Sequence, residues 1–310
     1  MRIMVMGAGG VGGYFGARLA AGGADVTLIA RGAHGEAIRR DGLFVKSFQG
    51  DLRVHPARCV ADPADAPPVD AVLFCVKLTD TETAARALLP AVEAGAEVFT
   101  LQNGVESAQM LDAIFGKGRT VAGAAYISST LGAPGHVIHT GQVPRLEFGE
   151  ADGKKSARVT SIVDAFRAAG VQAQVVPNIQ QSLWRKMSGL ASIASITTLT
   201  RAPIGPIRSE PRSRRLLKAL VDEAVAVGVA KNVGMAASDA ALIFAVIDAL
   251  DPAMRASMAF DIEHGKPLES PYLSGAIVRI GEKLGVPTPT HQFFCDALAV
   301  WEKGSGGTAP

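Results

Sequence analysis

The chain has 310 residues, which at roughly 150 residues per domain predicts about two domains. Hydrophobic residues make up 48% of the chain and charged residues 19%, so a sizeable core is expected and intrinsic disorder is not. The 31 basic and 29 acidic side chains leave a net charge of +2, and aromatic residues are only 5%. Neither value favours a nucleic acid or an anionic membrane as a partner.

The first half of the chain alternates short apolar runs with helical patterns, which is typical of βαβ units that form a parallel sheet. We expect a helix at Val11–Ala21 and strands at Arg2–Met6, Asp25–Ala30, Asp70–Lys77 and Glu97–Gln102. Glycine and proline between β-rich runs in residues 121–149 predict a hairpin-like pair of antiparallel strands. A helix at Lys155–Ala169 and a last strand at Val171–Val176 follow.

The second half carries no strand signal. Long helical periodicity starts at Asn178 and is expected to break near Pro203, Pro206 and Pro211. Further helices are predicted at Leu216–Val227, Asp239–Leu250 with Ser238 as N-cap, Pro252–Glu263, Pro271–Leu284 and Gln292–Lys303, with Gly285 and Gly304 as C-caps. We therefore expect an α/β dinucleotide-binding domain of the Rossmann type at residues 1–177, an all-helical domain at 178–303 and a flexible tail at 304–310.

The cysteines and the N-terminus indicate the compartment. The three cysteines, Cys59, Cys75 and Cys295, are widely spaced and form no CxxC pair, so neither a disulfide framework nor a metal site is predicted. The chain begins directly with a strand-like run, without the pattern of a signal peptide. No uninterrupted stretch reaches about 18 apolar residues, the length of a membrane helix. These features lead us to expect a cytoplasmic protein.

A glycine-rich turn follows the first predicted strand and opens the first helix. Gly7-Ala8-Gly9-Gly10-Val11-Gly12 matches GxGxxG, the pattern of dinucleotide-binding turns. Gly7 permits the tight turn, Gly9 lets the backbone approach a pyrophosphate, and Gly12 permits close packing of helix on strand. The alternative is a glycine-rich turn that binds no ligand.

The end of the second strand indicates which nicotinamide cofactor binds. NAD sites usually carry Asp or Glu there for the ribose hydroxyls, whereas this strand ends in Ala30-Arg31. A guanidinium can pair with the 2′-phosphate of NADP. Arg31 therefore favours NADP, unless it is only a solvated surface arginine.

Polar residues follow two further strands. Lys77 ends the third and Asn103 follows the fourth, and ligands of open α/β sheets bind at such strand ends. In the helical half, Lys186 lies on a mostly apolar helix, where a lysine can extend to solvent or act as a general acid toward a carbonyl oxygen. The pattern alone leaves both readings open.

Together these residues resemble the ketopantoate reductases (2-dehydropantoate 2-reductases). The resemblance covers Met1 to about Lys303. It rests on GAGGVGG, Arg31, CVK ending at Lys77, LQNG with Asn103, GHVIHTG, LWRK ending at Lys186, and the interval from Ser257-Met258 to Glu269. It implies a Rossmann domain followed by a helical domain like that of 6-phosphogluconate dehydrogenase. The implied activity is reduction of 2-dehydropantoate with NADPH, on the route to pantothenate and coenzyme A.

The resemblance also implies roles for single residues. Gly7, Ala8, Gly9, Gly10, Val11 and Gly12 would hold the pyrophosphate, and Arg31 and Lys77 the adenosine end with its 2′-phosphate. Asn103 would lie near the nicotinamide, with Ser129 as a backbone cofactor contact. Lys186 would be the proton donor, Ser257 would bind the substrate carboxylate, and Glu269 would join the catalytic network and touch the cofactor.

The substrate side departs from the family pattern. The positions four and eight residues beyond the lysine usually carry asparagines that bind the pantoate skeleton, and here they hold Leu190 and Ala194. At a third position where the family usually carries an asparagine, this sequence has Ile204. Loss of such hydrogen bonds weakens recognition of a polar substrate. An apolar wall at Leu190 and Ala194 would leave polar recognition to Ser257 and to Ser192 or Ser195.

We therefore expect an NADPH-dependent reductase of a small-molecule 2-oxo acid, with no nucleic-acid or membrane partner. One alternative is a family member that reduces a different, more apolar 2-oxo acid. Another is an NADPH-binding sensor without turnover, against which Lys186 and Glu269 argue, since a sensor needs neither. The sequence leaves a homodimer open.

Overall fold

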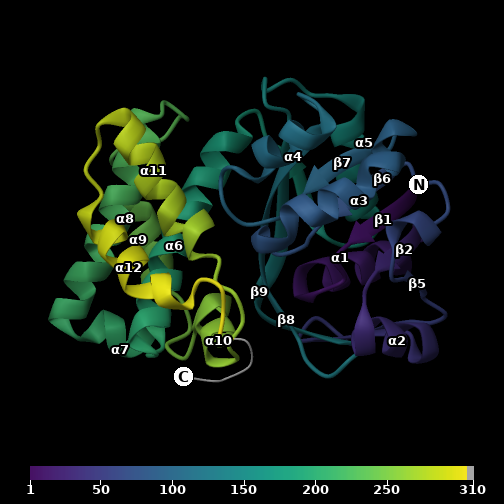
Figure 1. The fold of residues 1–310 in the computed structure, drawn as a ribbon, viewed down its shortest axis with the longest axis horizontal. Coiled ribbons are helices and arrows are strands. Elements are labelled where there is room, and N and C mark those ends of the chain that lie inside the picture. Colours follow the sequence, from purple (N-terminus) through teal and green to yellow (C-terminus); the bar gives the residue numbers. More distant parts are fainter. Residues whose placement is uncertain (306–310) are drawn as a thin grey trace. The chain divides into compact units, whose positions relative to one another are not determined.

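The computed structural model describes residues 1–305 as two compact units (Figure 1). One contains Met1–Gln102 and Ser107–Ile179. The other contains the residues from Gln180 onward together with a short piece of the first half, Asn103–Glu106. Of the flexible tail predicted at residues 304–310, residues 306–310 lie outside the described part of the chain.

The first unit is built on one sheet of ten strands. Their order is β4-β3-β9-β8-β7-β6-β1-β2-β5, with β10 paired to β9. The bounds are β1 Arg2–Met6, β2 Asp25–Ile29, β3 Leu43–Ser47, β4 Leu52–Val54, β5 Arg58–Val60, β6 Ala71–Phe74, β7 Glu97–Thr100, β8 Thr120–Leu131, β9 His136–Gly149 and β10 Gln172–Val175. β1 lies between β2 and β6, parallel to both. β8 and β9 form the antiparallel pair that the sequence predicts.

Helices cover both faces of this sheet. They are α1 Gly10–Ala21, α2 Gly32–Asp41, α3 Thr81–Glu93, α4 Ser107–Phe115 and α5 Ala157–Ala168. Because successive side chains of a strand point to opposite faces, Ile3 and Val5 of β1 join the core under α1 and α5. Met4 and Met6 join the core under α3 and α4. This double coverage explains why β1 reads as one continuous apolar run.

One predicted strand ends earlier than expected, and three strands were not predicted. The apolar run at Asp70–Lys77 leaves the sheet at Phe74, because its partner β1 ends at Met6, where Gly7 turns the chain with a φ of +94°. The last ladder bond joins the amide of Cys75 to the carbonyl of Met6. The sequence reading also missed β3, β4 and β5, of which the last two have only three residues each.

The second unit is all helical. Its α-helices are α6 Ile179–Thr200, α7 Ile204–Ser209, α8 Pro211–Ala230, α9 Asp239–Asp248, α10 Ser257–Glu263, α11 Ser274–Leu284 and α12 Pro289–Leu298. The predicted α/β fold followed by helices is thus confirmed.

Several helix boundaries differ from the expectation. The helix expected from Pro252 begins only at Ser257, and the one expected from Pro271 is a short 3-10 turn, Ser270–Tyr272, followed by α11. The break expected near Pro211 is present, because α7 ends at Ser209 and Pro211 begins α8, where the first turn of a helix needs no partner for its N–H groups. Pro206, by contrast, lies inside α7. Ser238 precedes α9, but its side chain makes no capping bond.

A chain of buried hydrogen bonds ties α6, α8, α11 and α12 together. His291 Nε2 lies 2.9 Å from the Leu220 carbonyl oxygen and His291 Nδ1 lies 2.8 Å from Ser274 Oγ, which lies 2.7 Å from Ser195 Oγ. Burial lowers the pKa of His291 to about 4, so the ring is neutral near pH 7. A carbonyl oxygen can only accept, so Nε2 carries the proton and Ser274 donates to Nδ1. Ser195 then donates to Ser274, which fixes α6 against α11.

Candidate active site

The glycine-rich turn between β1 and α1 is shaped by close backbone contacts. A β-carbon on Gly10 would lie 2.4 Å from the carbonyl oxygen of Ser129, and one on Gly12 would lie 2.1 Å from that of Gly7. Real β-carbons do not approach so closely, so these positions require glycine for packing. At Gly9, by contrast, a β-carbon would meet no atom within 4 Å. Gly9 is therefore where a ligand can approach the backbone.

The start of α1 fits the pyrophosphate of a dinucleotide. No side chain caps this helix, and its first turn carries no acidic residue. The N-terminal end of a helix bears partial positive charge and favours anions. Ser129 of β8 lies against Gly10, and its Oγ is buried with no hydrogen-bond partner among the described residues. These residues fit the cofactor that the sequence predicts.

Arg31 and Lys77 follow strands on either side of β1. Arg31 occupies the N-cap position of α2, two residues beyond β2, and its side chain is exposed. Lys77 is exposed three residues beyond β6. Because β2, β1 and β6 are parallel neighbours, both cations belong to the edge of the sheet that carries the glycine-rich turn.

Lys186 is the centre of the second group of predicted residues. Its Nζ donates a hydrogen bond of 3.0 Å to Asn103 Oδ1, within the helical unit to which Asn103–Glu106 belongs. Burial lowers the pKa of Lys186 to about 8, and the negative charge of Glu269, only 5% exposed, acts in the opposite direction. Lys186 is therefore an ammonium near pH 7 that can give up its proton readily. This group has what a proton donor toward a carbonyl oxygen needs.

The other predicted substrate residues differ in exposure. Leu190 is partly exposed one turn beyond Lys186 on α6, whereas Ala194 is 1% exposed and Ile204 is fully buried. Ser257 is exposed at the first position of α10.

The two serines of α6 considered for substrate recognition are engaged elsewhere. Ser192 donates to the carbonyl of Ser188 one turn back, and Ser195 bonds to Ser274. Both hydroxyls are buried inside the helical unit. That alternative for polar recognition is therefore wrong.

Two residues near this group were missed by the sequence reading. Arg279 of α11 donates from Nη2 to Glu106 Oε2 at 2.8 Å, and from Nη1 to the carbonyl of Pro271 at 2.7 Å. Glu106 lies three residues after Asn103, and Pro271 two residues after Glu269. The only sequence signal was the position of Glu106 close to Asn103.

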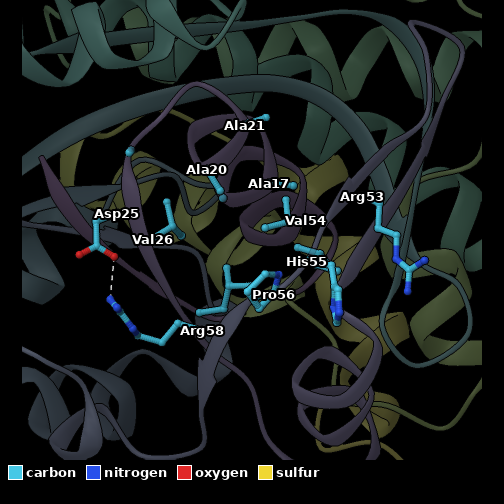
Figure 2. Close-up of a pocket in the computed structure, with 15 residues that line it drawn as sticks. Ala17, Ala20, Ala21, Asp25, Val26, Arg53, Val54, His55, Pro56 and Arg58 are labelled. Carbon is cyan, nitrogen blue, oxygen red and sulfur yellow. Dashed lines mark hydrogen bonds and ion pairs between the residues drawn. The ribbon is translucent and has the colours of Figure 1, made fainter.

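A surface cavity of about 610 Å³ lies elsewhere in the first unit (Figure 2). Its wall includes Ala17, Ala20 and Ala21 from the C-terminal half of α1, and the ion pair between Asp25 and Arg58 lies beside it. The glycine-rich turn is at the other, N-terminal end of α1. None of the predicted site residues lines this cavity.

Residues 1–305 contain neither a candidate metal-binding cluster nor a candidate membrane span. No three side chains of His, Cys, Asp or Glu gather there as they would around a metal ion. Within the same residues, no helix has the length and apolar composition of a membrane span.

Comparison with known proteins gives consistent matches along the chain. A family model described as "Ketopantoate reductase PanE/ApbA" matches residues 3–153, and "Ketopantoate reductase PanE/ApbA C terminal" matches residues 178–302. A 2-dehydropantoate 2-reductase of Archaeoglobus fulgidus is 31% identical over 304 residues, which cover 98% of each chain. The crystal structure of a PanE/ApbA family ketopantoate reductase from Ralstonia eutropha JMP134 superimposes with a TM-score of 0.89 at 32% identity, covering 97% of this chain and 98% of that one. A D-mandelate dehydrogenase, solved with NADH and anilino(oxo)acetate, shares the fold with a TM-score of 0.89 at 22% identity, over 97% and 98% of the two chains.

The contrast between Gly9 and Gly12 provides a test of dinucleotide binding. We expect Gly9→Ala to leave the urea unfolding midpoint unchanged, because a methyl group there meets open space, and to weaken NADPH binding at least tenfold, because the methyl group blocks the backbone. Gly12→Ala is the matched control that should lower the unfolding midpoint, because its methyl group collides with the turn. NADPH fluorescence titration and urea denaturation measure the two effects. Unchanged NADPH affinity in Gly9→Ala would contradict the assignment.

Proposed function

Because the chain belongs to the ketopantoate reductase family, whose members are oxidoreductases acting on a CH–OH group, we propose that it reduces the carbonyl group of a 2-oxo acid with NADPH. The observation that supports this most directly is the partly buried Lys186 ammonium, which is hydrogen-bonded to Asn103 and influenced by the charge of Glu269. In this proposal Gly7–Gly12 and Ser129 hold the dinucleotide, and Ser257 binds the substrate carboxylate.

Lys186 has two tasks in the proposed reaction. NADPH, when bound, supplies the hydride that the carbonyl carbon receives. The Lys186 ammonium stabilises the negative charge that develops on the carbonyl oxygen and then transfers its proton to that oxygen, which yields the 2-hydroxy acid. The neutral amine regains a proton from solvent. Asn103 orients the ammonium, and Glu269 keeps it protonated before the transfer.

The preference for NADPH over NADH is inferred from Arg31. The segment after β2 presents a guanidinium where NAD enzymes usually have a carboxylate, which would repel a 2′-phosphate. Lys77, exposed beyond the neighbouring strand β6, adds a second cation. Both are proposed to contact the adenosine end of the cofactor.

The substrate is proposed to be less polar than ketopantoate. Lys186 and Leu190 are one helical turn apart on α6, so their side chains share one face, and Leu190 is partly exposed there. An isobutyl group at this position supplies apolar contact and no hydrogen bond. Ala194 is 1% exposed, so it lies beneath this surface and Leu190 alone carries the argument. A 2-oxo acid with an aliphatic or aryl side chain suits this wall better than a hydroxylated one.

Reversing the charge at position 31 tests the choice of cofactor. We expect Arg31→Asp to weaken NADPH binding about 100-fold, since a charge-assisted hydrogen bond is replaced by repulsion, and to change NADH binding less than threefold. Arg40→Asp, the same charge change on the same helix, is the matched control and should affect neither cofactor. Fluorescence titration with both cofactors measures the constants. Equal affinity of the unmodified protein for NADPH and NADH would contradict the proposal.

A panel of 2-oxo acids tests the reaction and the substrate class. NADPH oxidation is followed with ketopantoate, 2-oxoisovalerate, longer branched 2-oxo acids and phenylglyoxylate, and we expect a higher kcat/KM for the apolar members than for ketopantoate. Leu190→Asn should raise kcat/KM for ketopantoate about tenfold, because it adds an amide beside Lys186. Leu216→Asn, at an exposed leucine of α8, is the matched control.

The outcomes of this panel separate the alternatives. Efficient ketopantoate turnover by the unmodified protein would show that the apolar wall does not set specificity. NADPH binding without oxidation for any 2-oxo acid would favour the sensor. Lys186→Met should abolish turnover while NADPH still binds, because it removes the proton donor and keeps the length of the side chain.

A further inference from the structure

Arg279 joins the two segments that flank the Lys186 ammonium. One segment is Asn103–Glu106, which carries the acceptor of the lysine, and the other is the 3-10 turn that follows Glu269. We propose that Arg279 is a positioning residue, which holds Asn103 and Glu269 in place around Lys186. This inference rests on the proposed role of Lys186 as the proton donor.

The contacts of Arg279 require an arginine. Its Nη2 binds Glu106 Oε2 at 2.8 Å, while its Nη1 binds the Pro271 carbonyl oxygen at 2.7 Å. A guanidinium is planar, always charged, and presents donors in fixed directions, so one side chain can hold two acceptors at once. A lysine keeps the charge but lacks this fork.

The segment Asn103–Glu106 depends on such an anchor. It has only four residues, and Gly104 turns the chain within it at a φ of +87°. Its first residue is bound to Lys186 and its last to Arg279. If the contact between Arg279 and Glu106 is lost, only the Lys186–Asn103 bond remains of these two, and the Glu106 end of the segment is less well held.

The segment after Glu269 is held in the same way. Ser270–Tyr272 is a single 3-10 turn, a form that is rarely stable in longer runs because its hydrogen-bond geometry is poor. The amides of Tyr272 and Leu273 bind the Glu269 carbonyl, which ties the turn to the residue that acts on Lys186. Arg279 fixes the turn from outside, through the carbonyl of Pro271.

The exposure of the ion pair indicates positioning more than stability. The side chains of Arg279 and Glu106 are 46% and 31% exposed, and ion pairs in such settings contribute little to the stability of a fold. A displacement of about 1 Å at a reacting group, however, can reduce a rate by up to about 100-fold. Loss of Arg279 should therefore affect Lys186 much more than it affects unfolding.

The direction of the effect on Lys186 follows from its surroundings. Its pKa is lowered overall, so burial outweighs the opposing charge of Glu269. When the two flanking segments loosen, the partly buried ammonium becomes more exposed to water, and the charge of Glu269 also becomes less well placed. Because burial is the larger of the two effects, the pKa should move up toward the ordinary value for lysine.

The test measures Lys186 directly, in the protein without cofactor or substrate. Amine-selective labelling over a range of pH, quantified by mass spectrometry, gives the pH midpoint of Lys186 reactivity. The variants are Arg279→Gln, Arg279→Lys, Glu106→Gln and the double Arg279→Gln/Glu106→Gln. Arg214→Gln is the matched control, because Arg214 forms an ion pair of 2.7 Å with Asp248 in the same unit at a similar exposure, 41% and 39%.

We expect Arg279→Gln to raise the midpoint of Lys186 by at least about half a pH unit and to lower kcat about tenfold, with the same urea unfolding midpoint as Arg214→Gln. Glu106→Gln should give a smaller shift, since it frees only one segment. Arg279→Lys should also give a smaller shift and a smaller loss of kcat than Arg279→Gln, because it keeps the positive charge. The double variant should be no worse than Arg279→Gln alone, because the contact with Glu106 is one of the two that Arg279→Gln already removes.

The proposal is overturned if Arg279→Gln moves the Lys186 midpoint and kcat no more than Arg214→Gln does. It is also overturned if, across the variants, kcat falls only in proportion to the urea unfolding midpoint. Failure of the proposed function gives a different result: either the unmodified protein shows no turnover or Lys186→Met retains it. The labelling shift caused by Arg279→Gln does not depend on turnover.

Discussion

The chemistry inferred for this protein depends on the placement of one ammonium group. Lys186 is buried enough for its pKa to fall to about 8, yet it keeps a hydrogen bond to Asn103 and the nearby charge of Glu269. Full burial without these partners would strip the lysine of its proton, and full exposure would leave the proton too tightly held. Burial and the charge of Glu269 act on this pKa in opposite directions, and the hydrogen bond to Asn103 holds the ammonium in place, as the proposed role of proton donor requires.

The helical unit is organised so that this balance is maintained. The buried chain from His291 through Ser274 to Ser195 fixes α6, the helix that carries Lys186, against α11. Arg279 extends from α11 to the two segments that flank the lysine. The glycine-rich turn of the first unit is shaped by steric limits instead: a β-carbon at Gly10 or Gly12 would collide with the backbone, whereas one at Gly9 would meet open space.

Local patterns explain which features could be predicted from the sequence. The strand β1 and the glycine-rich turn were predicted because an apolar run followed by GxGxxG is a signal contained within a dozen residues. The end of the third strand was placed too late, because it depends on where β1, its neighbour in the sheet, stops. The short strands β4 and β5 offer too few residues for a recognisable alternation.

The residues of the candidate site were proposed one by one from the sequence, but their contacts could not be predicted from it. Lys186 and Asn103 are 83 positions apart, and no periodicity links such distant residues. Arg279 and Glu106 were missed because exposed charges are usually only solvated. Ser192 was considered for substrate recognition, but its hydroxyl donates to the Ser188 carbonyl instead. Serines inside helices often bond to the carbonyl one turn back.

The pH dependence of kcat/KM, measured from pH 6.5 to 10 with the 2-oxo acid that reacts fastest, tests the central claim most directly. The donor form of Lys186 is the ammonium, which is lost as the pH rises through its pKa of about 8. We therefore predict that kcat/KM is constant below that value and falls about tenfold per pH unit well above it. A profile that stays flat to pH 10, with NADPH binding unchanged over the same range, would contradict the assignment of Lys186 as the proton donor.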